Sequence, residues 1–281
     1  MRIRLDIAYD GTHFRGWARQ PGLRTVQGEI EGALARVLGG EPRLVVAGRT
    51  DAGVHASGQV AHVDLDPVQT ERMLSGRART PHGDPVGVLA GRLRGVLGAY
   101  SDVTVIATRA APEGFDARFS AVWRRYAYRI ADHESGYDPL ERLRTTSVRA
   151  ALDADAMDEA ARSLVGLHDF AAYCKPREGA TTIRTLLEFD WARDDDGVLV
   201  ANVKADAFCH SMVRALVGGC VAVGEGRLSV PDLAAIRDGL ARVPEVKVLA
   251  ARGLTLTGVG YPADDLLAAR AVQTRNRRDV D

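Results

Sequence analysis

One loop of the sequence combines the residue types that a catalytic carboxylate needs. Asp51 stands between Gly48 and Gly53, with Arg49 two residues before it, in the segment AGRTDAGVHA. A neighbouring guanidinium keeps a carboxylate ionised, and an ionised carboxylate suits a nucleophile better than a general acid. The same pattern is also typical of a turn in which an aspartate accepts hydrogen bonds from nearby backbone N–H groups. Spacing alone leaves both interpretations open.

Two strands are expected to hold this loop, since catalytic groups are often carried on loops between rigid elements. The flanking segments 43–47 and 59–65 both have strand-like apolar patterns. Upstream, residues 2–9 alternate apolar and polar side chains, which predicts a half-buried strand. Thr25 is placed to cap a helix over residues 26–38, whose apolar residues recur at helical spacing.

The order of expected elements along the chain is β-α-β-β-α-β, and the second half repeats it approximately. The sequence therefore predicts an α/β (α+β) protein made of two ferredoxin-like, RRM-like halves. We expect domains at 1–110 and 111–263 and a tail, short helix or disordered, at 264–281, with a long mobile loop at 66–85 that could include a short helix. The other expected elements are a helix at 86–97, strands at 103–108 and 123–130, a helix at 155–165, strands at 184–191 and 198–204, a helix at 210–223, a helix from 229 and a strand at 254–261.

The charge of the chain is balanced in total but not along its length. The 281 residues carry 37 Lys+Arg and 37 Asp+Glu, a net charge of zero, which alone would argue against a polyanionic partner. Residues 1–130 hold 18 basic and 13 acidic side chains, and residues 131–281 hold 19 and 24. The half with the Asp51 loop is therefore basic, which suits contact with nucleic acid.

The cysteines and apolar runs indicate the cellular setting. Cys174, Cys209 and Cys220 are too few for a disulfide framework and form no CxxC pair, so we expect reduced thiols, with Cys209 and Cys220 in the core of one helix. No run reaches the length of a membrane span, and the N-terminus lacks the apolar segment of a signal peptide. These features predict a soluble, cytoplasmic protein.

Two other groups of residues could carry chemistry. His62, Asp64 and Asp66 lie on one face of the expected strand and could bind a divalent metal, although a solvated sheet face explains them better. His55 could be a general acid or base, but we favour a structural or RNA-contacting role. A metal-dependent hydrolase using Asp51, His62 and Asp64 therefore stays an alternative, as does a non-catalytic RNA-binding protein.

Five blocks of the sequence, in order, resemble the tRNA pseudouridine synthase A family. The segment GRTDAGVHASGQVAHV is similar to the active-site loop of that family. The other blocks are YDG with GWARQ at 9–20, FDARFSA with RRYAY at 115–128, AFCHSMVR at 207–214 and Gly253-Leu254. The resemblance covers residues 3 to 262. It departs from the family after Arg214, where Ala replaces the usual Asn, and before Leu254, where a common Pro is missing.

The resemblance implies a role for each matching residue. Asp51 would be the catalytic nucleophile, Arg49 would fill the gap left by the extruded nucleotide, and Tyr126 would stack on the uracil. Arg214 would pair with Asp51, Leu254 would wall the base pocket, and Arg118 would bind substrate. The resemblance also implies a pseudouridine synthase fold with a central cleft and a homodimer.

The implied activity is isomerisation of uridines at tRNA positions 38 to 40, in the anticodon stem-loop, to pseudouridine. This reaction exchanges an N–C glycosidic bond for a C–C bond without redox change or net hydrolysis. We therefore expect no cofactor and no metal, and the sequence contains neither a Walker loop nor a GxGxxG segment opening a helix after a strand.

Overall fold

The chain folds into two compact units. A computed structural model describes residues 1–75, 84–179 and 181–276. The first unit comprises Met1–Val122 together with the chain from Gly258 onward, and the second comprises Trp123–Thr257. These limits differ from the predicted division at 110 and 263, because the segment 111–122 and the C-terminal residues pack with the first unit. In the described part of the chain, no helix is long and apolar enough to cross a membrane.

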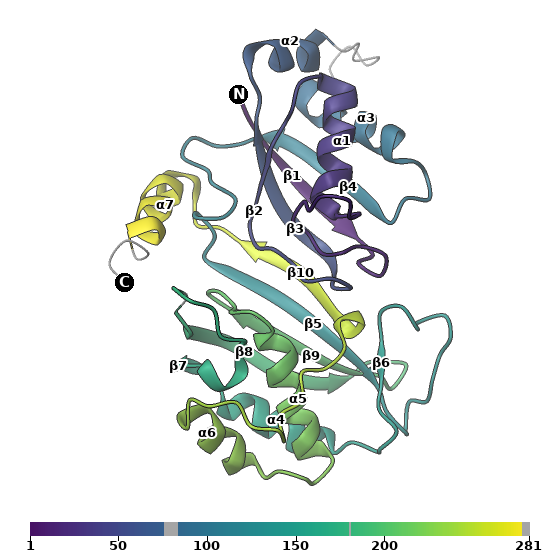
Figure 1. Cartoon of the computed structure of the whole chain (residues 1–281), viewed down its shortest axis with the longest axis vertical. Coiled ribbons are helices and arrows are strands. Elements are labelled where there is room, and N and C mark those ends of the chain that lie inside the picture. Colours follow the sequence, from purple (N-terminus) through teal and green to yellow (C-terminus); the bar gives the residue numbers. More distant parts are fainter. Residues whose placement is uncertain (76–83, 180, 277–281) are drawn as a thin grey trace. The chain divides into compact units, whose positions relative to one another are not determined.

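The first unit is a layer of antiparallel strands with helices packed on it (Figure 1). The strands pair in the order β4-β1-β3-β2. Side chains of β1 alternate between buried and half-buried, as the sequence pattern predicted. Its elements are β1 (Arg2–Tyr9), α1 (Val26–Leu38), β2 (Leu44–Val46), β3 (His55–Asp64), α2 (Pro67–Ser75), α3 (Pro85–Leu97), β4 (Val103–Ala110), η3 (Asp264–Leu266) and α7 (Leu267–Asn276).

Helix α1 shows how local sequence sets these elements. The Thr25 hydroxyl accepts a hydrogen bond from the Gly28 N–H at 3.3 Å and caps the helix, as predicted. Ile30 and Leu34, one turn apart, are fully buried on the face toward the sheet. Gly39 ends the helix with φ of 78°, a conformation that glycine adopts without strain.

The second unit also combines antiparallel strands with a helical layer. Strands β5, β9, β8 and β7 pair in that order, and the short β6 runs parallel to β5. Strand β10 (Leu254–Gly260) contains the boundary between the units. The remaining elements are β5 (Trp123–Ala131), β6 (Thr146–Ser147), α4 (Ala154–Ser163), β7 (Gly166–Asp169), η1 (Ala171–Tyr173), β8 (Ile183–Arg193), β9 (Leu199–Ala205), α5 (Met212–Gly224), α6 (Val230–Asp238) and η2 (Ala251–Gly253).

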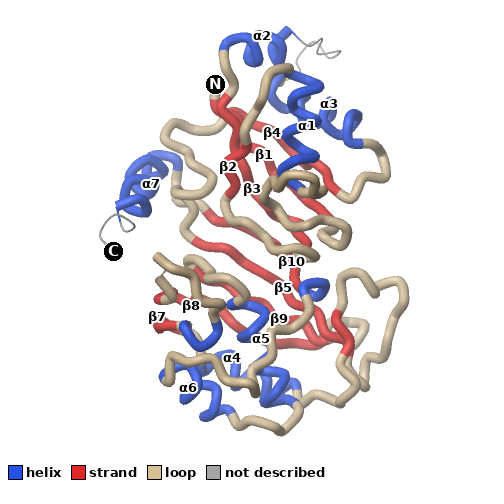
Figure 2. The backbone as a smooth tube through the Cα atoms, viewed as in Figure 1, coloured by secondary structure: helices blue, strands red, loops and turns tan. Residues whose placement is uncertain are grey.

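The structure refines several expected elements. The segment 66–85, expected as a long loop that could include a short helix, contains helix α2, drawn as helix in Figure 2, while its part at 76–83 lies outside the described residues. Strand β3 begins at His55 rather than at residue 59, and α5 begins at Met212 rather than at residue 210. The C-terminal segment forms helix α7, one of the two alternatives expected for it, and Leu267 of this helix is buried in a core cluster of the first unit.

The expectation of unpaired cysteines is wrong for two of the three. Cys174 and Cys209 form a disulfide in the second unit, with their Cα atoms 5.7 Å apart. Cys209 precedes α5, so it does not share a helix with Cys220, which is a buried residue of α5. Burial raises the pKa of the Cys220 thiol to about 12, which keeps it protonated and unreactive.

Candidate functional site

The Asp51 loop is built on buried polar groups. The Tyr9 hydroxyl lies 2.7 Å from the hydroxyl of Thr50, and both side chains are buried. The side-chain amide of Gln59 donates to the Gly48 carbonyl at 2.9 Å and to the Tyr9 hydroxyl at 3.3 Å. Burial raises the pKa of Tyr9 to about 12, so the hydroxyl keeps its proton for these hydrogen bonds. This buried hydrogen-bond network anchors the loop to the core of the first unit.

A second segment of backbone packs directly against the loop. The Trp17 N–H donates to the Thr50 carbonyl at 3.0 Å. A Cβ atom added to Gly11 would lie 2.0 Å from the Val54 carbonyl oxygen, so only glycine fits at this position. The Val54 N–H in turn donates to the Asp51 carbonyl at 3.2 Å and closes the turn. The YDG and GWARQ blocks of the sequence thus support the loop that follows them.

Asp51 and Arg49 lie in this loop with exposed side chains. Hydrogen bonds from backbone atoms and from the side chains of Tyr9, Thr50 and Gln59 hold the loop on both sides of them in sequence. The arrangement presents a carboxylate and a guanidinium on a rigid turn, which is what a nucleophile and its neighbouring cation require.

The two histidines near the loop have structural contacts. His55 is buried, and its Nδ1 accepts a hydrogen bond from the Gly11 N–H at 3.0 Å. His62 is also buried, and its Nδ1 accepts from the Ala117 N–H at 3.0 Å. Burial, reinforced by the nearby Arg2, lowers the pKa of His62, which favours the neutral ring that this hydrogen bond needs.

The residues of the metal-site alternative are therefore engaged elsewhere. The Asp64 carboxylate accepts two hydrogen bonds from the Arg2 guanidinium, each at 2.7 Å. Arg2 also donates to the Phe115 carbonyl at 2.6 Å. Within the described ranges, no group of three or more His, Cys, Asp or Glu side chains could hold a metal ion.

The segment 115–120, which carries Arg118, shares a core with the Asp51 loop. Phe115 and Ala117 pack in one buried cluster with Ala47, the residue that leads into the loop. The Tyr261 hydroxyl donates to the Ala117 carbonyl at 2.8 Å. Arg118 is exposed on the turn that follows. The first unit thus brings together two sequence blocks that are more than 60 residues apart.

Tyr126 lies on β5 in the second unit, with its side chain 9% exposed. Its ring forms a T-shaped contact with the Phe208 ring, with centroids 5.2 Å apart and an interplanar angle of 88°. Phe208 was not singled out from the sequence. Its position in the AFCHSMVR block, directly before Cys209, is the sequence feature that could have identified it as a site residue.

Arg214 and Leu254 also lie in the second unit. Arg214 is in the first turn of α5, and its Nε donates to the Leu249 carbonyl at 2.5 Å. Leu254 is the buried first residue of β10. A Cβ atom on the preceding Gly253 would lie 2.7 Å from the ring of Tyr128, which explains the glycine. The pairing of Arg214 with Asp51 and the wall made by Leu254 stay predictions.

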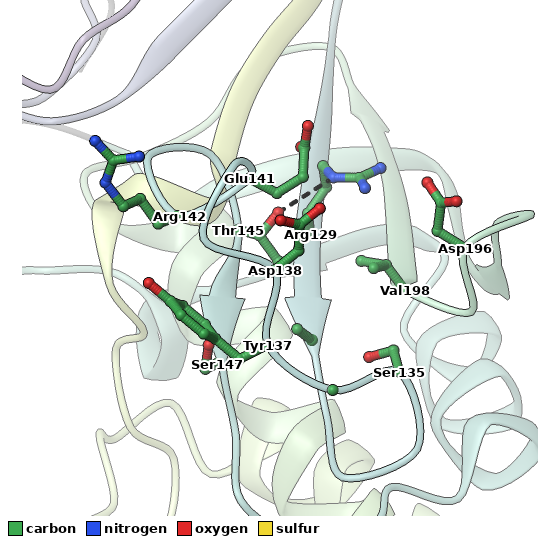
Figure 3. A pocket seen from close by; sticks show the side chains of 12 residues that line it. Arg129, Ser135, Tyr137, Asp138, Glu141, Arg142, Thr145, Ser147, Asp196 and Val198 are labelled. Atoms are coloured by element: carbon green, nitrogen blue, oxygen red, sulfur yellow. Dashed lines mark hydrogen bonds between the residues drawn. The ribbon is translucent and has the colours of Figure 1, made fainter.

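A separate cavity of about 210 Å³ lies beside β5 and β6 in the second unit (Figure 3). Arg129 crosses it, with its Nε 3.4 Å from the Thr145 hydroxyl and its Nη1 2.8 Å from Asp194. Arg142 and Glu141 also line it. None of the six site residues expected from the sequence lines this cavity.

Comparison with known proteins gives one consistent answer. The profile of a family described as tRNA pseudouridine synthase matches residues 160–262. The tRNA pseudouridine synthase A of Leifsonia xyli is 59% identical over 99% of this chain and 98% of its own length. The protein of the same name from Frankia casuarinae is 56% identical over 98% of this chain and 94% of its own.

Among solved structures, a chain of a Cbf5-Nop10-Gar1 complex is similar, and the alignment covers 78% of this chain and 54% of that chain. Its TM-score is 0.31 and its sequence identity 11%. The full-length sequence relatives decide the assignment: this chain belongs to the tRNA pseudouridine synthase A family.

Proposed function

We propose that this protein isomerises uridines of the tRNA anticodon stem-loop, at positions 38 to 40, to pseudouridine. The observation that carries the proposal is the Asp51 loop, an exposed carboxylate on a rigid buried scaffold in a chain 59% identical to a tRNA pseudouridine synthase A. The proposal makes the chain an isomerase acting on tRNA.

The chemistry needs few groups, and the proposed residues provide them. A uridine inside a stem or loop must leave its stack, and an aromatic side chain commonly stacks on the extruded base. Breaking the N–C bond and forming the C–C bond leaves the atoms of the substrate unchanged, so no cofactor is required. The proposed roles are nucleophile for Asp51, gap filling for Arg49, base stacking for Tyr126, pairing with Asp51 for Arg214, a pocket wall for Leu254 and substrate binding for Arg118.

The proposal extends to fold and setting. The element order of each unit supports a ferredoxin-like β-α-β-β-α-β domain, with α2, β6, β7, α6 and α7 as additional elements and β10 as the last strand of the second half. The strand order β4-β1-β3-β2 in the first unit supports this assignment. A homodimer and a cytoplasmic location complete the proposal.

The test is a reaction of the purified protein with an unmodified tRNA transcript, followed by digestion and nucleoside chromatography. We expect pseudouridine to form in the anticodon arm, at the same rate with EDTA when monovalent salt keeps the RNA folded. Binding without pseudouridine would instead indicate an RNA-binding protein. Strand cleavage that EDTA abolishes and Mg²⁺ restores would indicate a metal-dependent hydrolase. Pseudouridine mapping of tRNA from cells lacking the protein extends the test in vivo.

A further inference from the structure

Phe208 lies on the segment of residues 206–211 that joins β9 to α5, and its side chain is only half-buried. Two other phenylalanines of the second unit, Phe170 and Phe189, are buried in the core, as is usual for this residue type. The ring of Phe208 instead makes a T-shaped contact with the ring of Tyr126, with centroids 5.2 Å apart. Filling the core therefore does not account for Phe208.

The first residue of the 206–211 segment, Asp206, is anchored to two strands. Its carbonyl accepts a hydrogen bond from Nη1 of Arg124 at 2.8 Å, and Arg124 lies on β5 two residues before Tyr126. The Asp206 N–H donates to the carbonyl of Thr185 on β8 at 3.1 Å, and the Asp206 carboxylate accepts from the Thr185 N–H at 3.1 Å. The segment therefore begins at a defined position relative to the strand that carries Tyr126.

The other end of the 206–211 segment is anchored to the residues that follow η1. Cys209 is joined to Cys174 by the disulfide, and the His210 carbonyl accepts a hydrogen bond from the Lys175 N–H at 2.9 Å. Ser211 then has φ of 66°, a left-handed conformation that is unfavourable for residues other than glycine. Such a conformation persists where the surrounding contacts impose it. The segment is thus fixed on both sides of Phe208.

The sheet fixes the backbone of Tyr126 but does not by itself select the orientation of its ring. Tyr126 pairs with Val203 in the β5–β9 ladder. On a strand, two χ1 rotamers are common and the ring torsion χ2 is broad, so a paired backbone is compatible with several ring orientations. An aromatic neighbour favours particular ring planes, because aromatic pairs prefer T-shaped and offset geometries. Stacking on a base depends on the plane of the ring, so this orientation matters for the role proposed for Tyr126.

We propose that Phe208 is a positioning residue for the reaction. Its ring holds the ring of Tyr126 in the orientation that stacks on the extruded uracil, and the anchored 206–211 segment holds Phe208. The proposal rests on the proposed function for the role of Tyr126. It adds a residue that acts through Tyr126 rather than through contact with the substrate.

The experiment is a double-mutant cycle with Phe208→Leu and Tyr126→Ala, measured as single-turnover pseudouridine formation in an unmodified tRNA transcript. Phe208→Leu alone should lower the rate at saturating enzyme about threefold to tenfold, the range that an aromatic pair contributes. The enzyme concentration that gives half the maximal rate should stay within about twofold of the wild type, because the ring orientation acts after the RNA has bound. In the Tyr126→Ala background, Phe208→Leu should change the rate by less than about twofold, since the contact is already lost.

Two further variants separate positioning from a general effect on the fold. Phe208→Tyr keeps the ring, and its hydroxyl can reach solvent from a half-buried side chain, so it should retain the wild-type rate. Phe170→Leu is the matched control, because it removes a ring of the same unit whose ring contacts are with His168 and Tyr173. It should lower the free energy of unfolding and leave the rate of pseudouridine formation unchanged.

Two kinetic results would overturn the proposal. A loss of the same size in both backgrounds would mean that Phe208 acts without Tyr126, and a wild-type rate for Phe208→Leu would mean that the contact has no effect on the reaction. Either result, in a protein that forms pseudouridine, contradicts the positioning role and leaves the proposed function intact.

Urea unfolding of the four proteins of the cycle gives a readout that needs no catalysis. If the two rings hold each other, the changes in the unfolding equilibrium constant should depart from additivity by about threefold to tenfold. Additive changes would overturn the proposal even in a protein that forms no pseudouridine. Coupled rings in a protein that forms no pseudouridine would contradict the proposed function instead.

Discussion

The two regions proposed to handle the uridine are held by different forces. The Asp51 loop in the first unit is fixed by buried hydrogen bonds among Tyr9, Thr50 and Gln59. Tyr126 in the second unit is held in the β5–β9 ladder, and its ring packs against Phe208. Hydrogen bonds set the position of a reacting carboxylate narrowly, whereas ring packing holds a broad, apolar surface in place. The difference agrees with the roles proposed for the two residues, a nucleophile for Asp51 and a stacking partner for Tyr126.

The Tyr126 region also contains the Cys174–Cys209 disulfide, because Cys209 directly follows Phe208 in the sequence. The disulfide joins residues 35 apart in sequence, and a loop of that length corresponds to about 3–4 kcal/mol of chain entropy. We therefore expect Cys174→Ser to lower the free energy of unfolding by about this amount, measured by urea denaturation. Cys220→Ser is not a suitable control, because it places a hydroxyl in the core. The wild type with its disulfide reduced is the better comparison and should lose a similar free energy of unfolding.

The thiol count checks the same point. Denatured, unreduced protein should react with one equivalent of alkylating reagent at Cys220, and reduced protein with three. Three equivalents without prior reduction would show that Cys174 and Cys209 are not bonded.

The Asp51 loop should be most sensitive to backbone displacement. Gly11→Ala places a methyl group against the Val54 carbonyl and must shift the loop. A displacement of about 1 Å can cost about 100-fold in rate, so we expect a loss of that size in single-turnover pseudouridine formation. Gly32→Ala, on α1 with open space around the added atom, should leave the rate unchanged. Equal rates for the two variants would show that the loop tolerates movement.

The Tyr126 region should respond to loss of the ring rather than of the hydroxyl. Stacking on a base is worth about 1–3 kcal/mol, so Tyr126→Ala should lower single-turnover activity by about 10- to 100-fold. Tyr126→Phe keeps the ring and its contact with Phe208 and should lose only a few-fold. Equal losses in the two variants would move the role from the ring to the hydroxyl.

The smallest expected effect is on the pH dependence of stability. The pKa of His62 is lowered in the folded chain, so the unfolded chain binds the proton more readily. The stability contributed by neutral His62 is complete above about pH 6.5 and falls as the pH drops toward the folded value. His62→Asn keeps an acceptor for the Ala117 N–H and removes the titration.

Below pH 6.5 the difference in unfolding free energy between His62→Asn and the wild type should change by no more than about 1.4 kcal/mol per pH unit. It should change in favour of the variant as the pH falls. The exposed His13→Asn is the control and should follow the wild type. A pH-independent difference for His62→Asn would mean that His62 does not titrate differently on folding.

The elements with strong local patterns could be predicted from the sequence. The alternation in β1 and the Thr25 cap of α1 depend on neighbouring residues, so both were readable. The Cys174–Cys209 disulfide and the packing of α7 depend on contacts between residues distant in sequence, so the spacing of apolar residues along the chain does not predict them. In the site, the roles of Asp51 and Arg49 stay predictions from their motif. The hydrogen bonds of Gln59 were not predicted, because they form only when β1 and β3 pair.

The most direct test is single-turnover release of tritium from tRNA labelled at uridine C5, by the wild type and by Asp51→Asn. The asparagine keeps the size of the side chain and removes the charge, so tRNA affinity should stay within about threefold of the wild type. Release should fall by at least about 1,000-fold, as expected for loss of a nucleophile. Glu71→Gln, an exposed charge change in the same unit, should release label at the wild-type rate. Release by Asp51→Asn within tenfold of the wild type would contradict the assignment of Asp51 as the catalytic carboxylate.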